Sequence, residues 1–198
     1  MSETRRLKAE LRKAMLALRD ALPPQHRATW SARICRSALA SPAYQTARTV
    51  HVFLSIGSEV DTTALITQAL AEGKRVVVPI FEKHSAETPC AQITSLDARA
   101  FTRDAHGLRR PRVLRLVPVE DVDVVFVPLV AYAPVVVDGR EHYARLGYGS
   151  GYYDAFLHRV RDDTAKIGLA FSAQRLAHIP LSPWDMLLDA VITELTDL

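Results

Sequence analysis

The spacing of apolar side chains predicts two helices at the start of the chain. Within residues 4–21 the apolar positions fall on one stripe at helical spacing: Leu7, Leu11, Met15 and Leu18. Pro23 and Pro24 end this helix, because proline cannot donate the backbone hydrogen bond that a helix interior requires, and proline is well tolerated in the first turn of the next helix. We therefore expect a second helix over residues 25–40.

The next part of the chain alternates apolar strands with a helix. Continuous apolar runs predict strands over residues 49–55 and 75–81. Between them a helix is expected to begin after Asp61 or Thr62, either of which can cap it, and to end at about Glu72. Strands that are apolar throughout are typical of a parallel sheet covered on both faces, so the pattern predicts an α/β fold.

The second half of the chain is expected to supply the remaining strands at 122–127, 166–171 and 190–193. Residues 82–118 contain several prolines and scattered charges, and we expect short strands and loops at the sheet edge there. The stretch after residue 127 is interpreted as a long polar connection that leads to a glycine-rich loop and then to a helix over about 150–160.

The length and the hydropathy favour one domain away from membranes. A chain of 198 residues is long enough for one α/β domain with a full core and short for two, so we expect a single domain over 1–198. The longest apolar run, 122–137, is interrupted by Asp123 and two prolines and does not predict a membrane span. The N-terminus lacks the apolar segment of a secretory signal, and its acidic residues argue against a transit peptide. We expect a cytoplasmic protein.

Charge and cysteine content change this picture little. The net charge of +3 and a pI of about 9.0 raise the possibility of RNA binding, but the basic residues are spread out and not interleaved with aromatic ones. We therefore expect no nucleic-acid partner. Cys35 and Cys90 lie far apart in the sequence, which indicates neither a zinc site nor a disulfide framework and fits a reducing compartment.

The segment Arg145–Asp154, RLGYGSGYYD, carries the strongest chemical signal. Glycines alternate at 147, 149 and 151 immediately before an amphipathic helical pattern. Without Cβ atoms the backbone N–H groups can approach an anion closely, and Arg145 can add a charged contact to a phosphate. The spacing is neither that of the Walker loop nor that of the dinucleotide fingerprint, and such a loop can also be a tight connection. The density of arginine, glycine and tyrosine favours an anion site.

RLGYGSGYYD closely resembles the RLGxGxGYYD signature of 5-formyltetrahydrofolate cyclo-ligases. Four further segments resemble that family in the same order along the chain: Lys8–Arg12, Phe53–Thr62, Gly73–Pro79 and Ile167–Glu194. The resemblance therefore covers nearly the whole sequence. It implies a three-layer α/β sandwich around a mostly parallel sheet, similar to sugar-phosphate isomerases of the NagB and RpiA type and to CoA transferases.

The resemblance also implies a reaction. Members of the family convert 5-formyltetrahydrofolate to 5,10-methenyltetrahydrofolate, consuming ATP with Mg²⁺ and releasing ADP and phosphate. The formyl oxygen is a poor leaving group, and its phosphorylation would make the carbon electrophilic for attack by N10. Catalysis then depends mainly on positioning and on neutralising charge on the transferred phosphoryl group. We expect a small folate as substrate and a monomer, with a weak homodimer as the alternative.

Site residues follow from the resemblance position by position. Residues expected at ATP are Lys8, Arg12, Arg145, Leu146, Gly147, Tyr148, Gly149, Ser150, Gly151, Tyr152 and Tyr153. Residues expected at the folate are Leu54, Glu59, Tyr148, Gly149, Ser150, Gly151 and Tyr152. Arg145, Tyr152 and Asp154 are expected to act in catalysis, and Asp154 and Asp189 to hold Mg²⁺ directly or through water. From residue type alone, the lysine and arginines would more often lie on a solvated helix face, and the tyrosines could equally be core residues.

The sequence departs from the family pattern at two places. The link before Arg145 is about seven residues longer than usual and lacks a Phe-Asp pair, and Trp184 stands where histidine is commoner. Two other functions remain open: another phosphate-substrate enzyme on the same fold, and a nucleotide- or RNA-binding module without turnover. Fold alone does not separate them.

Overall fold

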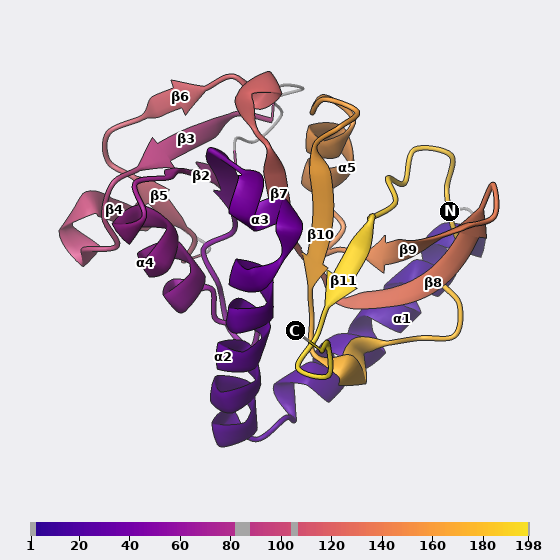
Figure 1. Ribbon diagram of the computed structural model, residues 1–198. Helices are drawn as coiled ribbons and strands as arrows, with labels where there is room; N and C mark the ends of the chain where they lie inside the picture. Colours follow the sequence, from indigo (N-terminus) through magenta and orange to yellow (C-terminus); the bar gives the residue numbers. More distant parts are fainter. Residues whose placement is uncertain (1–2, 82–87, 104–106, 198) are drawn as a thin grey trace.

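The computed structural model describes residues 3–81, 88–103 and 107–197 (Figure 1). Its centre is a seven-stranded sheet in the order β11-β10-β7-β1-β2-β3-β6. The parallel strands are β1 (Thr49–Val52), β2 (Arg75–Pro79), β7 (Val124–Pro128), β10 (Ala165–Leu169) and β11 (Ala190–Ile192). The expectation of a mostly parallel α/β sheet is confirmed.

The segment between β2 and β7 extends the sheet at one edge, as predicted. The strands β3 (Cys90–Ile93) and β6 (Arg115–Val117) pair in antiparallel fashion beyond β2. The strands β4 (Phe101–Arg103) and β5 (Arg109–Pro111) instead form a separate two-stranded sheet. Single-turn helices η1 (Ala98–Ala100) and η2 (Val119–Asp121) connect these pieces. Residues 82–87 and 104–106 of this predicted edge region lie outside the described residues.

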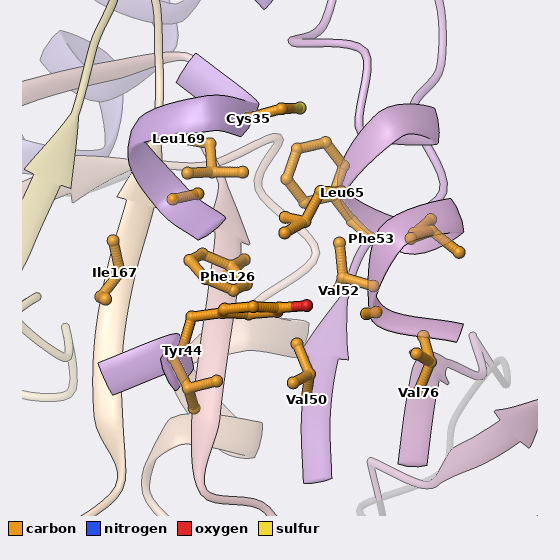
Figure 2. Packing of buried hydrophobic residues seen from close by; sticks show 14 of the residues in the cluster. Cys35, Tyr44, Val50, Val52, Phe53, Leu65, Val76, Phe126, Ile167 and Leu169 are labelled. Atoms are coloured by element: carbon orange, nitrogen blue, oxygen red, sulfur yellow. The ribbon is translucent and has the colours of Figure 1, made fainter. Parts of the chain in front are cut away.

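Helices cover the sheet on both faces. On one side lie α2 (Pro24–Ala40), α3 (Pro42–Thr46) and α4 (Thr63–Ala71), and on the other lies α5 (Tyr152–Leu157). The strands alternate between these layers: Val124 and Phe126 of β7 face α2 and α4, whereas Val125 and Val127 pack against α5. Figure 2 shows strand residues of β1, β2, β7 and β10 converging on Tyr44 and Leu65 in the first of these layers. The three-layer expectation therefore holds.

The first helix, α1 (Glu3–Asp20), lies apart from both layers, at the carboxyl ends of the parallel strands. Its buried Met15 packs with Val130 and Ala131, which directly follow β7, and with Leu146. Both helices predicted at the start of the chain are present, with bounds that differ by one residue. The short helix α3 was not predicted. Among the described residues, no helix combines the length and the apolar character needed to cross a membrane.

The stretch interpreted as a polar connection is a β-hairpin, which corrects the sequence prediction. The strands β8 (Ala131–Val137) and β9 (Arg140–Leu146) pair over their full length. At the turn, Asp138 and Gly139 both have positive φ angles, 49° and 73°, as a two-residue type I′ turn requires. The longer link before Arg145 is therefore ordered, and its second strand leads directly into the glycine loop.

Candidate active site

The glycine loop, Gly147–Gly151, lies at the carboxyl edge of the sheet. It follows β9, and the backbone N–H of Val130, just beyond the end of β7, donates to the carbonyl of Leu146 over 2.7 Å. Gly149 and Gly151 have φ angles of 104° and 76°, a region that residues with a Cβ rarely adopt. In open α/β sheets, ligands bind at this edge. The loop is thus in the position expected for an anion site.

One face of α1 places two cations beside the loop. Arg12 Nε donates to the carbonyl of Gly147 over 2.7 Å. A Cβ added at Gly149 would lie 3.4 Å from the Arg12 guanidinium, so the loop passes directly over that group. One helical turn earlier, Lys8 is bonded to Asp185 and donates to Ser182 Oγ over 3.1 Å. The structure therefore brings both predicted α1 residues, Lys8 and Arg12, to the site.

Arg145 lies behind the loop rather than open to solvent. Its Nη2 donates to Asp154 Oδ1 over 2.7 Å, and its side chain is only 4% exposed. Nη1 lies 3.8 Å from the position that a Cβ on Gly147 would occupy. Burial lowers the pKa of this guanidinium, and the neighbouring Asp154 opposes that effect. Asp154 occupies Nη2, so a contact of Arg145 with an anion would have to use its other nitrogens.

The acidic residues differ from the prediction in one respect. Asp154 belongs to the site, where its Oδ1 also accepts from the backbone N–H of Met186 over 3.1 Å. Asp189 does not, because its side chain accepts from the N–H of Lys166 and its own N–H donates to the Lys166 carbonyl, at the amino end of β10. That is the opposite edge of the sheet from the glycine loop. The expectation that Asp189 joins Asp154 is therefore corrected.

Asp185 is the second carboxylate near the loop, and sequence reasoning missed it. It is paired with Lys8, it accepts from the N–H of Ser182 over 2.7 Å, and its charge acts on Arg145. The sequence offered a weak signal, since Asp185 and Asp189 are one helical turn apart in number but lie in a segment that is not helical. Without the helical repeat the two side chains do not share a face, and only Asp185 lies near Arg145.

A second polar cluster lies on the other side of Tyr148. Arg19 of α1 is buried, and its Nη2 donates to Tyr148 Oη over 2.6 Å. Glu59 hydrogen-bonds the same hydroxyl and accepts from the N–H of Ile56 over 3.0 Å. Burial raises the pKa of Glu59, although Ile56, Tyr148 and Arg19 oppose the change, and burial raises the pKa of Tyr148 to about 12. The predicted folate residue Glu59 thus borders the glycine loop.

Arg19 was not predicted, although its spacing contained a signal. Lys8, Arg12 and Arg19 are separated by four and seven residues, which brings all three onto one side of a helix with 3.6 residues per turn. Arg19 Nε also donates to Ser58 Oγ over 2.9 Å, and Nη1 to the Leu129 carbonyl over 3.3 Å. It therefore ties α1 to the loops that follow β1 and β7.

The two tyrosines after the loop pack into the protein. Tyr152 Oη donates to the Pro89 carbonyl over 2.9 Å, and its ring lies 4.7 Å from that of Phe81. Tyr153 is buried against His51 and Phe156, and its hydroxyl has no hydrogen-bond partner within the described residues. Their contacts are those of core residues that anchor α5 beneath the loop.

The remaining predicted residues lie around these groups. Ser150 is exposed at the loop tip, and its hydroxyl accepts from the N–H of Tyr152 over 3.4 Å. Leu54 follows β1 at the same sheet edge and is half-buried against the core. Its side chain can contribute apolar surface next to the segment that contains Glu59.

The carboxylates fit a magnesium ion that is shared with a phosphate ligand. Among residues 3–81, 88–103 and 107–197, no three His, Cys, Asp or Glu side chains form a cluster that could hold a metal alone. Mg²⁺ usually takes one or two carboxylates and completes its shell with phosphate oxygens and water. Asp154, paired with Arg145, and Asp185, paired with Lys8, are two carboxylates of the kind that such a site would use.

The fold and the site together define a class: an α/β protein with a glycine loop at the carboxyl edge of its sheet and the basic face of its first helix beside that loop. A sequence model of the 5-formyltetrahydrofolate cyclo-ligase family matches residues 4–194. The chain belongs to the 5-formyltetrahydrofolate cyclo-ligase family.

Individual relatives agree with this assignment. The 5-formyltetrahydrofolate cyclo-ligase of Escherichia coli K12 is 30% identical over 88% of this chain and 93% of its own length. A probable 5-formyltetrahydrofolate cyclo-ligase of Caenorhabditis elegans is 29% identical over 98% of this chain and 96% of its own. The solved 5,10-methenyltetrahydrofolate synthetase of Aquifex aeolicus superposes with a TM-score of 0.79 at 31% identity, covering 96% of this chain and 91% of that one.

Proposed function

We propose that the protein converts 5-formyltetrahydrofolate to 5,10-methenyltetrahydrofolate with ATP as co-substrate. The observation that carries the proposal is a glycine loop with Arg12 and Arg145 against it and with Lys8 one turn from Arg12 on the same helix, in a chain that matches the cyclo-ligase family over residues 4–194. Three cations around bare backbone amides suit a polyphosphate better than a singly charged ligand.

The phosphate side of the reaction is assigned to the loop and to α1. The backbone of Leu146–Tyr153 would surround the phosphates, and Arg12, already fixed to the Gly147 carbonyl, would neutralise charge from below. Lys8 can exchange its contact with Asp185 for a phosphate oxygen, because a flexible ammonium is easily redirected. Arg145 would act chiefly by holding Asp154 and the base of the loop, since it is buried and paired.

The folate side is assigned to the cluster around Glu59. Its carboxylate can accept hydrogen bonds from the N–H groups of a pterin, and Leu54 can pack against the ring. Tyr148, held by Arg19 and Glu59, stands between this cluster and the loop, where it can orient the formyl group toward the phosphate. Tyr152 would support the loop through its contacts with Pro89 and Phe81 rather than react.

The chemistry requires phosphoryl transfer to the formyl oxygen of the folate, followed by attack of N10 on the activated carbon and departure of phosphate. Positioning and charge neutralisation account for most of the catalysis in such transfers. Mg²⁺ held by Asp154 and Asp185 would neutralise charge on the phosphates. We further propose that the protein is a monomer and does not bind RNA. We also propose that it lies in the cytoplasm, a reducing compartment that fits its two buried free thiols.

The direct test is spectroscopic. The product contains a conjugated methenyl bridge that absorbs in the near ultraviolet, whereas the substrate does not. Purified protein with 5-formyltetrahydrofolate, ATP and Mg²⁺ should generate this absorbance together with one ADP per product, and the omission of ATP or Mg²⁺ should abolish it. If the band forms equally fast without ATP, or never forms, the proposed activity is wrong.

A further inference from the structure

A hollow of about 550 Å³ is lined in part by Glu59 and by no residue of the glycine loop. One wall is the segment that follows β1, which contributes Ser55–Gly57, Glu59 and Asp61. The opposite wall is the two-stranded sheet β4–β5, which contributes Arg103 and Arg109. This volume lies within the range of small-molecule sites. The hollow therefore continues the proposed folate site toward two arginines that the reaction chemistry does not use.

Strand register places the two guanidiniums on the same face. Arg103 and Arg109 are direct cross-strand partners in the antiparallel pair, and Thr102 is the partner of Arg110. Because side chains alternate along a strand, Arg103 and Arg109 point toward the hollow, whereas Arg110 belongs to the other face. Like charges directly opposite each other destabilise a strand pair, and an anion between them would relieve that repulsion.

The contacts already made by the pair leave capacity for a ligand. Arg103 Nη1 donates to the Gly107 carbonyl over 2.9 Å, and the Arg109 guanidinium lies 5.8 Å from the centre of the Phe101 ring. Burial and the charge of Arg103 lower the pKa of Arg109, and Asp61 across the hollow opposes this. The acidic groups facing the pair are thus Asp61 and, farther along, Glu59, which is hydrogen-bonded to Ile56 and Tyr148.

We propose that Arg103 and Arg109 bind the carboxylates of the substrate's glutamate tail. The inference rests on the proposed function. The hollow has an accepting end at Glu59, suited to the N–H donors of a pterin, and a cationic end at the arginines. A reduced folate has the matching polarity, with N–H donors on its ring and carboxylates on its tail. Guanidinium forks pair with carboxylates through two parallel hydrogen bonds, so each added glutamate supplies further ligands for the pair.

The test compares three substrates that differ only in the tail: 5-formyltetrahydropteroate, which has no glutamate, the monoglutamate and the triglutamate. Arg109→Ala should raise KM for the triglutamate about tenfold, the effect of losing one charge-assisted contact. It should leave kcat, KM for ATP and KM for the glutamate-free substrate unchanged. Arg103→Ala should act in the same direction, and Arg109→Lys should fall between wild type and Arg109→Ala. At about 0.5 M NaCl the wild-type preference should shrink toward that of the variants.

Arg110→Ala is the matched control, because it removes one charge from the same strand on the opposite face. It should leave the ratio of the KM values for the three substrates at the wild-type value. Circular dichroism checks that each variant is folded. An unchanged ratio in both Arg109→Ala and Arg103→Ala, or an equal change in Arg110→Ala, would overturn the inference while the cyclo-ligase activity stands. Absence of the methenyl band in the wild type with every substrate would instead overturn the proposed function.

Discussion

His51 shows how a single residue can connect the core beneath the site to the response of the protein to pH. It is fully buried in the middle of β1, with its ring 4.4 Å from that of Phe156, and neither imidazole nitrogen has a hydrogen-bond partner among the described residues. Burial lowers its pKa to about 3. The folded protein therefore keeps this imidazole neutral under conditions in which an unfolded chain protonates it.

The stability of the protein should fall on acidification because of His51. Below the unfolded pKa of about 6.5 the unfolded state binds one more proton than the folded state, so protonation favours unfolding. Between about pH 7.5 and about pH 5 this one group should remove roughly 2 kcal/mol from the free energy of unfolding. Urea titrations at both pH values measure the loss. In His51→Leu the loss should be smaller by that amount, and an equal loss in both proteins would contradict the assignment.

Residue-level prediction from the sequence identified residues near the loop where a motif fixed the position, and it misplaced residues where only spacing was available. Arg12 bonds the glycine loop, Lys8 lies one turn earlier on the same helix, and Asp154 follows the loop in α5. Asp185 was passed over for Asp189, because distance along the chain does not reveal at which strand end a carboxylate lies. Arg19 required the assumption that α1 remains straight for three turns, which residue type alone does not establish.

At the scale of elements, the path of the glycine loop depends on one backbone conformation. Gly149 combines a φ angle of 104° with the guanidinium of Arg12 directly beneath it. A side chain there would strain the backbone and displace the group that is assigned to the phosphates. Gly73 has a comparable φ of 74° with open space around it, at the end of α4. A substitution at Gly73 would therefore test backbone strain alone, whereas one at Gly149 would add crowding against Arg12.

Gly149→Val should raise KM for ATP at least tenfold, because both the loop amides and Arg12 would move. Both Gly149→Val and Gly73→Val should lower the free energy of unfolding by roughly 1 to 2 kcal/mol, because each forces a side chain into a left-handed backbone conformation. Gly73→Val should keep the wild-type KM for ATP. Steady-state kinetics and thermal melting of the two variants measure both quantities. Wild-type KM for ATP in Gly149→Val would mean that the loop does not surround the phosphates.

The elements themselves were largely predictable because burial imposes a period on the sequence. The apolar runs of β1, β2, β7 and β10 and the stripe of α1 were all recognised. The β8–β9 hairpin was missed although Asp138-Gly139 is a strong turn signal. Its strands contain Pro134 and charged residues, and the half of each strand next to the turn is largely exposed. The apolar and polar positions therefore do not alternate in the way that indicates a strand. The separate β4–β5 sheet was missed because strands of three residues leave almost no periodic signal.

At the scale of the whole molecule, the direction of the parallel strands separates two acidic residues that are only four positions apart. Asp185 lies at the carboxyl edge with Lys8, and Asp189 at the amino edge with Lys166. The sheet therefore determines which of them can share an ion with Asp154. Gly168, in the strand between these edges, keeps the segment close: a Cβ there would lie 2.8 Å from side-chain atoms of Leu129 and Leu188.

Asp185→Asn should increase the Mg²⁺ concentration needed for half-maximal activity about tenfold, because one of two carboxylates is lost. Asp189→Asn should leave this requirement unchanged and act, if at all, on stability through the start of β10. Titrations of activity with Mg²⁺ at saturating ATP compare the two variants. The reverse ranking would return the metal role to Asp189.

The β8–β9 hairpin also has a consequence for how the loop could be modified. Seven residue pairs follow its turn, and Leu146, which belongs to the last of them, accepts a hydrogen bond from Val130. Lengthening the hairpin by one residue on each arm would preserve the pairing at its base, whereas one residue added to a single arm would turn every side chain of β9 to the opposite side. A label or a short peptide inserted at Asp138 should therefore leave the base of the hairpin, and the glycine loop that follows it, in place.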